Sequence, residues 1–200
     1  MTALRPDLAT ILRRIEPGAR VLDIGCGDGA LMAALTAKDV DARGIEIDGG
    51  CVASCVAQGL SVVQGDADRD LTFYPDGAFD YAVLSQTLQT AARPDRMMQE
   101  LLRVGRRAFV SFPNFAYWRM RWALLSRGRM PVTRHLPVSW YETDNIHHVT
   151  VRDFELLADA LGIAIERRWF FTRDREMPAG GANWRAEYAL FEVSGGPHAD

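Results

Sequence analysis

The feature that most constrains this chain is a short apolar strand that runs directly into three glycines at alternate positions. The strand covers residues 20–24, the glycines are Gly25, Gly27 and Gly29, and a helical pattern follows from Ala30. Glycine suits this turn because the backbone needs positive φ angles and because a ligand can approach a residue without a Cβ atom. The free N–H groups at the start of the helix then face that ligand. The loop is therefore typical of a site for a nucleotide-type cofactor.

The spacing of the glycines fits two kinds of cofactor. Gly25, Gly27 and Ala30 match the dinucleotide pattern G-x-G-x-x-G/A, and Glu46 lies about 20 residues further on, where an acid binds a ribose. Asp23 favours a different cofactor, because NAD-binding folds usually carry an apolar residue at that point of the strand. A carboxylate there suits a ligand that carries an ammonium group.

A third acid, Asp66, follows the next expected strand along the chain, at 61–64, so that acids stand near three consecutive strand ends. Together with the glycines, this set resembles the cofactor site of class I S-adenosylmethionine-dependent methyltransferases. The resemblance implies that Asp23 and the glycine loop surround the methionine end of the cofactor. It also implies that Glu46 binds the ribose hydroxyls and that Asp66 and the Ala67 backbone meet the adenine. The residues expected to bind S-adenosylmethionine or S-adenosylhomocysteine are Asp23, Gly25, Cys26, Gly27, Gly29, Glu46, Ile47, Asp66, Ala67 and Ser85.

The alternation of strands and helices predicts an α/β fold, doubly wound, with helices on both faces of a parallel sheet. The expected strands are residues 20–24, 42–47, 61–64, 79–84, 108–112, 163–171 and 188–193. The last two can pair as a hairpin, which matches the reversed edge strand of the class I methyltransferase sheet, a mainly parallel seven-stranded sheet of the Rossmann-like type. Residues 172–186 between them are expected to form a long hairpin loop.

Length and charge limit the organisation and the partners. Two hundred residues suit one domain, expected over 1–194 with a frayed tail at 195–200. The net charge of −3 argues against a general nucleic-acid partner. Because no apolar signal core and no membrane-length apolar run occurs, no membrane partner and a cytoplasmic location are expected.

An insertion at about 113–149 interrupts the pattern and is dense in tryptophan, tyrosine and arginine. These residue types are common at protein interfaces, and they can also form a lid over a small substrate or a surface for RNA. A fourth interpretation is a helix packed on its own domain, because apolar side chains recur at helical spacing. That face consists of Phe115, Trp118, Trp122 and Leu125. The candidate residues for a partner or a substrate are Gln86, Trp118, Arg119, Arg121, Trp122, Trp140 and Tyr141.

Few other residues are candidates for chemistry. Ser85 and Gln86 follow the strand 79–84, where they can orient a small polar substrate or cap a turn. His148 is the candidate general base because imidazole titrates near neutrality; a structural role beside Thr150, the expected helix N-cap, is the alternative. Neither the adjacent histidines nor the three cysteines have the spacing of metal ligands, so no metal site is expected.

The whole chain resembles the methionine-biosynthesis protein MetW family. The matching segments are 21–29, 44–48, 64–68, 80–89, 112–115, 140–148 and 150–154, of which the last two are the most particular. The resemblance implies a methyltransferase-like protein that works with a homoserine O-acyltransferase in methionine synthesis, as an accessory or regulatory partner. The alternative is an active methyltransferase that moves a methyl group from S-adenosylmethionine to a small molecule. RNA methylation is disfavoured by the negative charge and by the absence of a (D/N)PP(Y/F) motif after the fourth expected strand.

Overall fold

The computed structural model describes residues 4–133, 139 and 142–195. Its strands are β1 (Arg20–Ile24), β2 (Asp41–Glu46), β3 (Ser61–Gln64), β4 (Phe79–Ser85), β5 (Gly105–Pro113), β6 (Ile163–Thr172), β7 (Arg175–Met177) and β8 (Tyr188–Gly195). Its helices are α1 (Pro6–Arg14), α2 (Ala30–Thr36), α3 (Gly49–Ala57), α4 (Ala67–Asp70), α5 (Pro94–Val104), α6 (Trp118–Arg127), α7 (Val151–Ala160) and α8 (Ala182–Arg185), with 3-10 turns η1 (Leu71–Phe73) and η2 (Leu88–Thr90).

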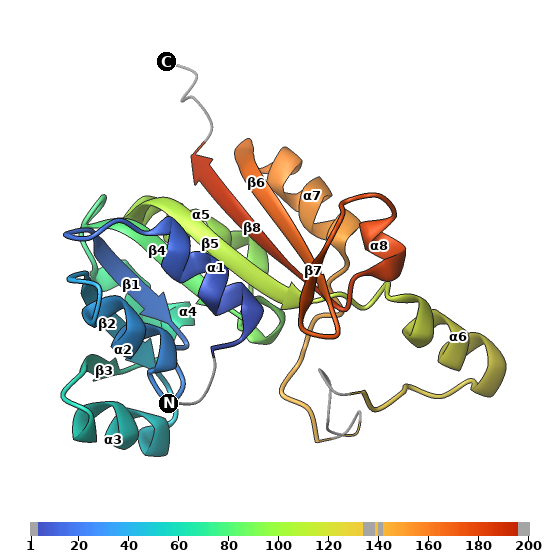
Figure 1. Ribbon diagram of the computed structural model, residues 1–200, viewed down its shortest axis with the longest axis horizontal. Helices are drawn as coiled ribbons and strands as arrows, with labels where there is room; N and C mark the ends of the chain where they lie inside the picture. Colours follow the sequence, from blue (N-terminus) through green and yellow to red (C-terminus); the bar gives the residue numbers. More distant parts are fainter. Residues whose placement is uncertain (1–3, 134–138, 140–141, 196–200) are drawn as a thin grey trace.

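The described residues form one sheet with the order β3-β2-β1-β4-β5-β8-β6-β7 (Figure 1). Strands β1 to β5 are parallel, and β8 lies antiparallel between β5 and β6. The expected fold class is confirmed, including the hairpin pairing of the last two long strands. The number of strands is eight rather than seven, because the segment expected to be a loop contains β7. Arg173 and Asp174, both with positive φ, turn the chain back so that β7 pairs with β6, and α8 follows in the same segment.

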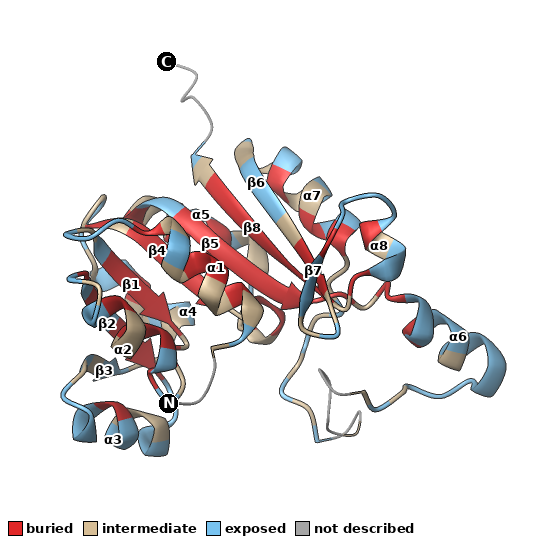
Figure 2. Cartoon of the chain, in the orientation of Figure 1, coloured by how far each residue is buried: buried red, intermediate tan, exposed pale blue. Residues whose placement is uncertain are grey.

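Helices cover both faces of the sheet, as the alternating pattern predicts. On one face α1, α2 and α3 bury apolar side chains such as Ile11, Met32 and Cys55. On the other face α5 and α7 contribute Leu101 and Phe154. Figure 2 shows the buried residues concentrated along β1, β5 and β8, between these two layers. None of the helices in the described ranges is long and apolar enough to cross a membrane.

The helix within the insertion leaves most of its apolar face uncovered by its own domain. Figure 1 shows α6 extending past the end of the sheet, beyond β7 and α8. Trp122 is 64% exposed and Leu125 is 80% exposed, whereas Met120 is buried. The interpretation of Phe115, Trp118, Trp122 and Leu125 as a core-facing stripe is therefore wrong. Helical spacing shows that a face is apolar, but it does not show what covers that face.

The chain returns from the insertion at α7, whose first residue follows the expected N-cap. The Thr150 hydroxyl accepts a hydrogen bond from Asp153 N at 3.1 Å, and this satisfies one of the free N–H groups of the helix. The expected N-cap role of Thr150 is thus confirmed.

Candidate functional site

The glycine loop lies at the carboxyl end of β1, between β2 and β4. Gly25 N donates to Ile45 O at 2.9 Å, and Gly25 has a φ of +70°. A Cβ atom at Gly25 would lie 2.6 Å from Thr87 Oγ1, whereas one at Gly27 would meet no atom within 4 Å. Gly25 is therefore needed for packing as well as conformation, and Gly27 faces open space. The predicted succession of strand, glycine loop and helix is confirmed.

Glu46 holds this loop in place. Its side chain is largely buried, Oε2 accepts from Gly27 N at 2.8 Å, and Oε1 accepts from Asp48 N at 2.9 Å. Each carboxylate oxygen can accept more than one hydrogen bond. Glu46 can therefore organise the loop and still accept hydrogen bonds from a ligand.

Asp23 lies in β1, where its register partners are Gly44 and Val83. It is 3% exposed. Burial raises the pKa of the Asp23 carboxyl from 3.8 to about 7, the positive charge of Arg5 opposes this rise, and the charge of Glu46 adds to it. A buried carboxyl of this kind gains its charge at lower pH when a cationic group lies beside it.

A cleft of about 650 Å³ opens beside the loop. It is lined by Gly25, Ile45, Glu46, Ile47, Asp48, Asp66, Ala67, Asp68, Thr87, Thr90, Ala91, Met97 and Asp144. Five of the residues expected to bind the cofactor thus line one cavity. Asp66 also caps α4, since its carboxylate accepts from Asp68 N at 3.1 Å. Exposed Ile47 provides apolar surface at the wall.

Several lining residues carry no local sequence signal of this role. Thr87 and Thr90 lie at the turn after β4, and Met97 lies on α5. Asp144 comes from the segment that returns from the insertion and is far from the glycine loop in sequence. Only the folded path of the chain brings it to the cleft.

Ser85 and Gln86 lie at the end of β4, at a turn with unusual backbone geometry. Gln86 has a φ of +58°, its N–H donates to Ser111 O at 2.9 Å, and its carbonyl accepts from Gln89 Nε2 at 2.6 Å. Such a conformation persists only where neighbouring contacts hold it. Ser85 belongs to a hydrogen-bond network with Asp7 that the sequence did not indicate.

The remaining candidates for chemistry are not among the residues that line the cleft. His148 is exposed, and its ring lies edge-on to Phe115 with centroids 4.6 Å apart. Cys26 is buried, and burial raises the pKa of its thiol, which disfavours the nucleophilic thiolate. The three cysteines are free, and the described part of the chain holds no group of three His, Cys, Asp or Glu side chains suited to a metal ion.

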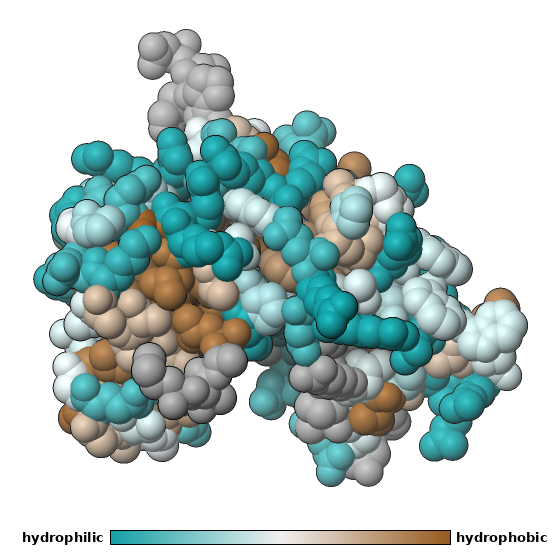
Figure 3. Space-filling view, viewed as in Figure 1, coloured by the Kyte–Doolittle hydropathy of each residue, from teal (hydrophilic) through white to brown (hydrophobic). Residues whose placement is uncertain are grey.

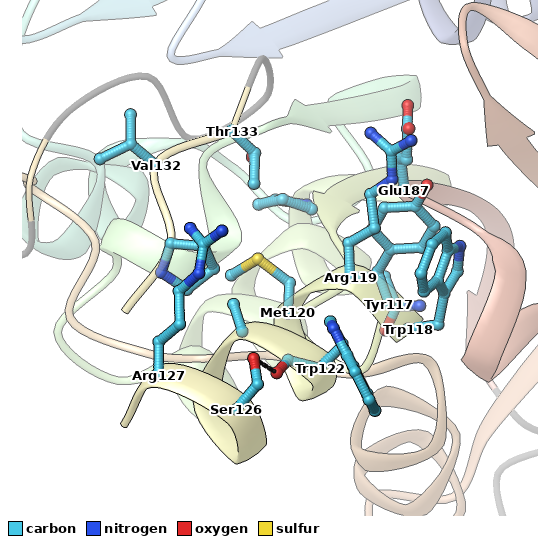
Figure 4. Close-up of a pocket in the computed structure, with 14 residues that line it drawn as sticks. Tyr117, Trp118, Arg119, Met120, Trp122, Ser126, Arg127, Val132, Thr133 and Glu187 are labelled. Atoms are coloured by element: carbon cyan, nitrogen blue, oxygen red, sulfur yellow. Dashed lines mark hydrogen bonds between the residues drawn. The ribbon is translucent and has the colours of Figure 1, made fainter. Parts of the chain in front are cut away.

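A second cavity, of about 500 Å³, lies beside α6, and Figure 4 shows the side chains around it. Its lining includes Tyr117, Trp118, Met120, Trp122 and Val132. The space-filling view shows pale and brown side chains next to teal ones over α6, at the right-hand end of the molecule (Figure 3).

The arginines beside this cavity have two different roles. Arg119 lies over the Trp118 ring at 5.3 Å, on the helix surface. Arg121 instead donates from Nε to Ala116 O at 2.6 Å and stacks over Trp184 at 5.1 Å, so that it connects α6 to α8. Trp140 and Tyr141, the other two aromatic candidates, lie outside the described residues.

The fold and the glycine-and-acid cleft place the chain in the class of methyltransferase-like α/β proteins. It is similar to a SAM-dependent methyltransferase from Archaeoglobus fulgidus, with 16% identity, coverage of 95% of this chain and 92% of that chain, and a TM-score of 0.70. An S-adenosylmethionine-dependent methyltransferase from Mesorhizobium loti is 19% identical, with 94% and 96% coverage and a TM-score of 0.70. At these identities the likeness concerns the fold alone.

The sequence narrows the class further. Residues 5–193 match the model of the family described as methionine biosynthesis protein MetW, and the chain belongs to that family. A bifunctional methionine biosynthesis protein MetXA/MetW from Rhodopirellula baltica is 32% identical to this chain, and the match covers 94% of this chain. The match spans 32% of that relative, so this chain corresponds to about a third of its length. The chain is thus a member of the MetW family with a methyltransferase-like fold.

Proposed function

We propose that the chain binds S-adenosylmethionine or S-adenosylhomocysteine in the cleft and acts as an accessory or regulatory partner of a homoserine O-acyltransferase. The observation that supports cofactor binding is the Glu46–Gly27 contact, in which a largely buried carboxylate that lines the cleft holds the glycine loop. The membership in a methionine biosynthesis family supports the second half.

The arrangement of acids suits an adenosyl ligand with an amino-acid end. Glu46 has free lone pairs for ribose hydroxyls, and Ile47, Asp66 and Ala67 line the wall where an adenine would lie. Asp23 at the foot of the loop suits an ammonium group, because a nearby cation stabilises its buried carboxylate.

Isothermal titration with S-adenosylhomocysteine, S-adenosylmethionine and NAD tests the cofactor. Glu46→Ala is expected to weaken binding of both adenosyl ligands by about 1–3 kcal/mol, because hydrogen bonds to a charged group are lost. Asp41→Ala is the matched control, since Asp41 is an exposed acid at the opposite end of the same strand. Tight binding of NAD without binding of either adenosyl ligand would overturn this half of the proposal.

The partner is proposed from the relative and from the surface of α6. The relative's name joins MetXA and MetW in one protein, and two thirds of its length lies outside the match. Residues 115–133 carry four arginines and no acid, and Trp122 is 64% exposed. Tryptophan and arginine are enriched among the residues that dominate binding energy at interfaces. We therefore assign α6 as the docking surface for the acyltransferase.

Size-exclusion chromatography of the mixed proteins at micromolar concentration tests the interaction. The double variant Arg119→Glu/Trp122→Ala should weaken the complex and leave binding of S-adenosylhomocysteine intact. Arg106→Glu/Leu156→Ala is the matched control, because both residues are exposed and lie away from α6. Arg121 is left unchanged, since it holds the chain's own Ala116 carbonyl. Two independent peaks for the wild-type proteins would refute the partner.

Hydrogen bonds between the end of the insertion and the turn after β4 support control of the partner by the ligand. Asp144 lines the cleft, and the next residues along that segment, Ile146 and His147, donate their N–H groups to Gln89 O at 2.9 and 3.0 Å. Gln89 in turn donates to the Gln86 carbonyl at the end of β4. The segment that leads out of the insertion is therefore bonded to the rim of the cofactor cleft.

The test is acyltransferase activity of the complex, titrated with S-adenosylmethionine, for wild type and for Asp23→Ala/Glu46→Ala. Ligand control requires different affinities for the free and the complexed chain, and each 1.4 kcal/mol of difference changes the coupling about tenfold. The acyltransferase activity of the wild-type complex should change with the concentration of S-adenosylmethionine, and that of the complex with the double variant should not. A flat response of the wild type would refute ligand control.

The alternative function is methyl transfer to a small molecule. Transfer from a sulfonium is an in-line displacement to which positioning contributes much of the rate, so a carboxylate or amine acceptor needs no strong base. An unactivated hydroxyl would need one, and His148 is the candidate. Transfer of labelled methyl from S-adenosylmethionine to a metabolite would favour this alternative over a purely regulatory role.

A further inference from the structure

A buried hydrogen-bond network joins the start of α1 to the ends of β4 and β5. Asp7, in the first turn of α1, is fully buried. Its Oδ2 accepts from Ser111 Oγ at 2.8 Å and from Ser85 Oγ at 3.2 Å. Arg5 donates to the same carboxylate through Nε at 3.2 Å and through Nη2 at 3.0 Å. The network holds the Arg5 guanidinium through two parallel hydrogen bonds, a geometry that fixes its plane.

This guanidinium lies at the end of β4, the strand that pairs with β1. Arg5 Nη2 lies 2.5 Å from Ser85 Oγ, and Ser85 follows Leu84, which pairs with Ile24 immediately before Gly25. The positive charge of Arg5 also acts on Asp23, whose pKa it lowers. A fixed cation at the end of β4 thus acts on a buried carboxyl of the neighbouring strand β1.

Arg5 retains capacity to bind a ligand. Its side chain is half exposed, and its Nη1 makes no hydrogen bond within the described part of the chain. Asp7 occupies Nε and Nη2, which leaves the two N–H groups of Nη1 available. These two N–H groups can donate charge-assisted hydrogen bonds to a carboxylate, and the charge of a guanidinium persists at every pH of interest.

We propose that Arg5 binds the α-carboxylate of the adenosyl ligand, while Asp23 faces its α-ammonium. An amino-acid end carries both charges close together, and Arg5 at the end of β4 and Asp23 on the neighbouring β1 carry the two complementary charges. Asp7, Ser85 and Ser111 act as positioning residues, because they hold the guanidinium and do not meet the ligand. This assignment rests on the proposed cofactor binding and names the part of the ligand that each charge recognises.

Truncated ligands separate this role from a structural one. The two probes are S-adenosylhomocysteine and 5′-methylthioadenosine, which lacks the whole amino-acid end. Arg5→Ala should weaken binding of S-adenosylhomocysteine at least about tenfold, since a charge-assisted contact is lost, and leave binding of 5′-methylthioadenosine within about twofold. Arg5→Lys, which keeps the charge without the fork, should weaken the first probe less. Arg13→Ala, a change on the same helix at a residue that contacts Thr10, should alter neither affinity.

A third probe removes dependence on the variant. The decarboxylated analogue of S-adenosylhomocysteine keeps the amine and lacks the carboxylate. The wild-type protein should bind this analogue as weakly as Arg5→Ala binds S-adenosylhomocysteine. The Arg5→Ala protein should bind the analogue and S-adenosylhomocysteine with equal affinity. Equal affinity of the wild-type protein for the analogue and for S-adenosylhomocysteine would overturn the assignment of Arg5. A folded Arg5→Ala protein that loses the same affinity for S-adenosylhomocysteine and for 5′-methylthioadenosine would overturn it too. Wild type that binds none of the three would instead overturn the proposed cofactor site, and this assignment with it.

Discussion

The cofactor cleft and the α6 surface of this protein are organised in opposite ways. In the cleft, Glu46 is 8% exposed and both of its oxygens already hold backbone N–H groups. On α6, Trp122 and Leu125 are 64% and 80% exposed, and among the residues of this helix it is Met120 that is buried. The first region is shaped before any ligand arrives, whereas the second presents apolar surface that its own domain does not cover.

The two regions are therefore expected to contribute differently to the free energies of folding and of binding. A pre-organised cleft loses little conformational freedom when a small ligand enters, which favours affinity. Exposed aromatic side chains contribute little to folding, so their removal costs the domain little and an interface much. Substitutions in the two regions are therefore expected to differ in how much they change stability and how much they change binding.

The largest effect is expected in the core that supports the cleft. Phe191 is fully buried on β8, and its ring centroid lies 4.5 Å from Phe154 and 5.8 Å from Phe112. Phe191→Ala should lower the free energy of unfolding by about 3–5 kcal/mol, because a cavity replaces these contacts. Phe191→Leu should lower it by about 1 kcal/mol and keep the protein folded. Denaturant unfolding measures both, and equal stabilities of the three proteins would contradict the described core.

The next effect is a pH dependence centred on Asp23. The pKa of Asp23 is about 7 in the folded chain, and we take 3.8, its usual value, for the unfolded chain. Between pH 3.8 and about 7 the folded chain therefore holds a proton that the unfolded chain releases. Folding stability without ligand should therefore fall as pH rises from about 4 to 7, by at most about 4 kcal/mol. Asp23→Asn should lack this fall. Unfolding curves at several pH values give the slope, and parallel slopes for the two proteins would show that Asp23 is not buried as described.

A smaller effect is expected where the insertion rejoins the domain. Thr150→Ala removes the hydroxyl that accepts from Asp153 N, and it should cost about 1 kcal/mol of stability. Thr150→Ser keeps a hydroxyl and serves as the control. Binding of S-adenosylhomocysteine should not change in either variant, because Thr150 is not among the described residues that line the cleft. Thermal unfolding and titration measure the two quantities separately.

The smallest effect is expected on α6 itself. Trp122→Ala should change the free energy of unfolding by less than about 0.5 kcal/mol, because the side chain is mostly exposed. Leu125→Ser should behave in the same way. A loss above about 1 kcal/mol in both variants would show that α6 packs on its own domain in solution, and the contrast between the two regions would then fail.

The sequence alone predicted the local part of the fold correctly. The apolar run before Gly25, the glycine spacing and the alternation of strands and helices indicated the fold class, because each depends on neighbouring residues. Five of the ten residues expected to bind the cofactor line the described cleft. The segment 172–186 was predicted as a loop, since the turn at Arg173 and Asp174 carries no glycine to mark the hairpin.

Only the tertiary structure decided the contacts between distant segments. Asp144, from the insertion, lines the cleft, and Arg5, from the start of the chain, bonds Ser85. Folding brings both residues to strand ends that are distant from them in sequence. The same holds for Trp122, whose helical spacing predicted an apolar face but not its exposure. Periodicity and turn residues report backbone conformation, which is local, whereas burial and hydrogen-bond partners depend on which remote segment arrives at each surface.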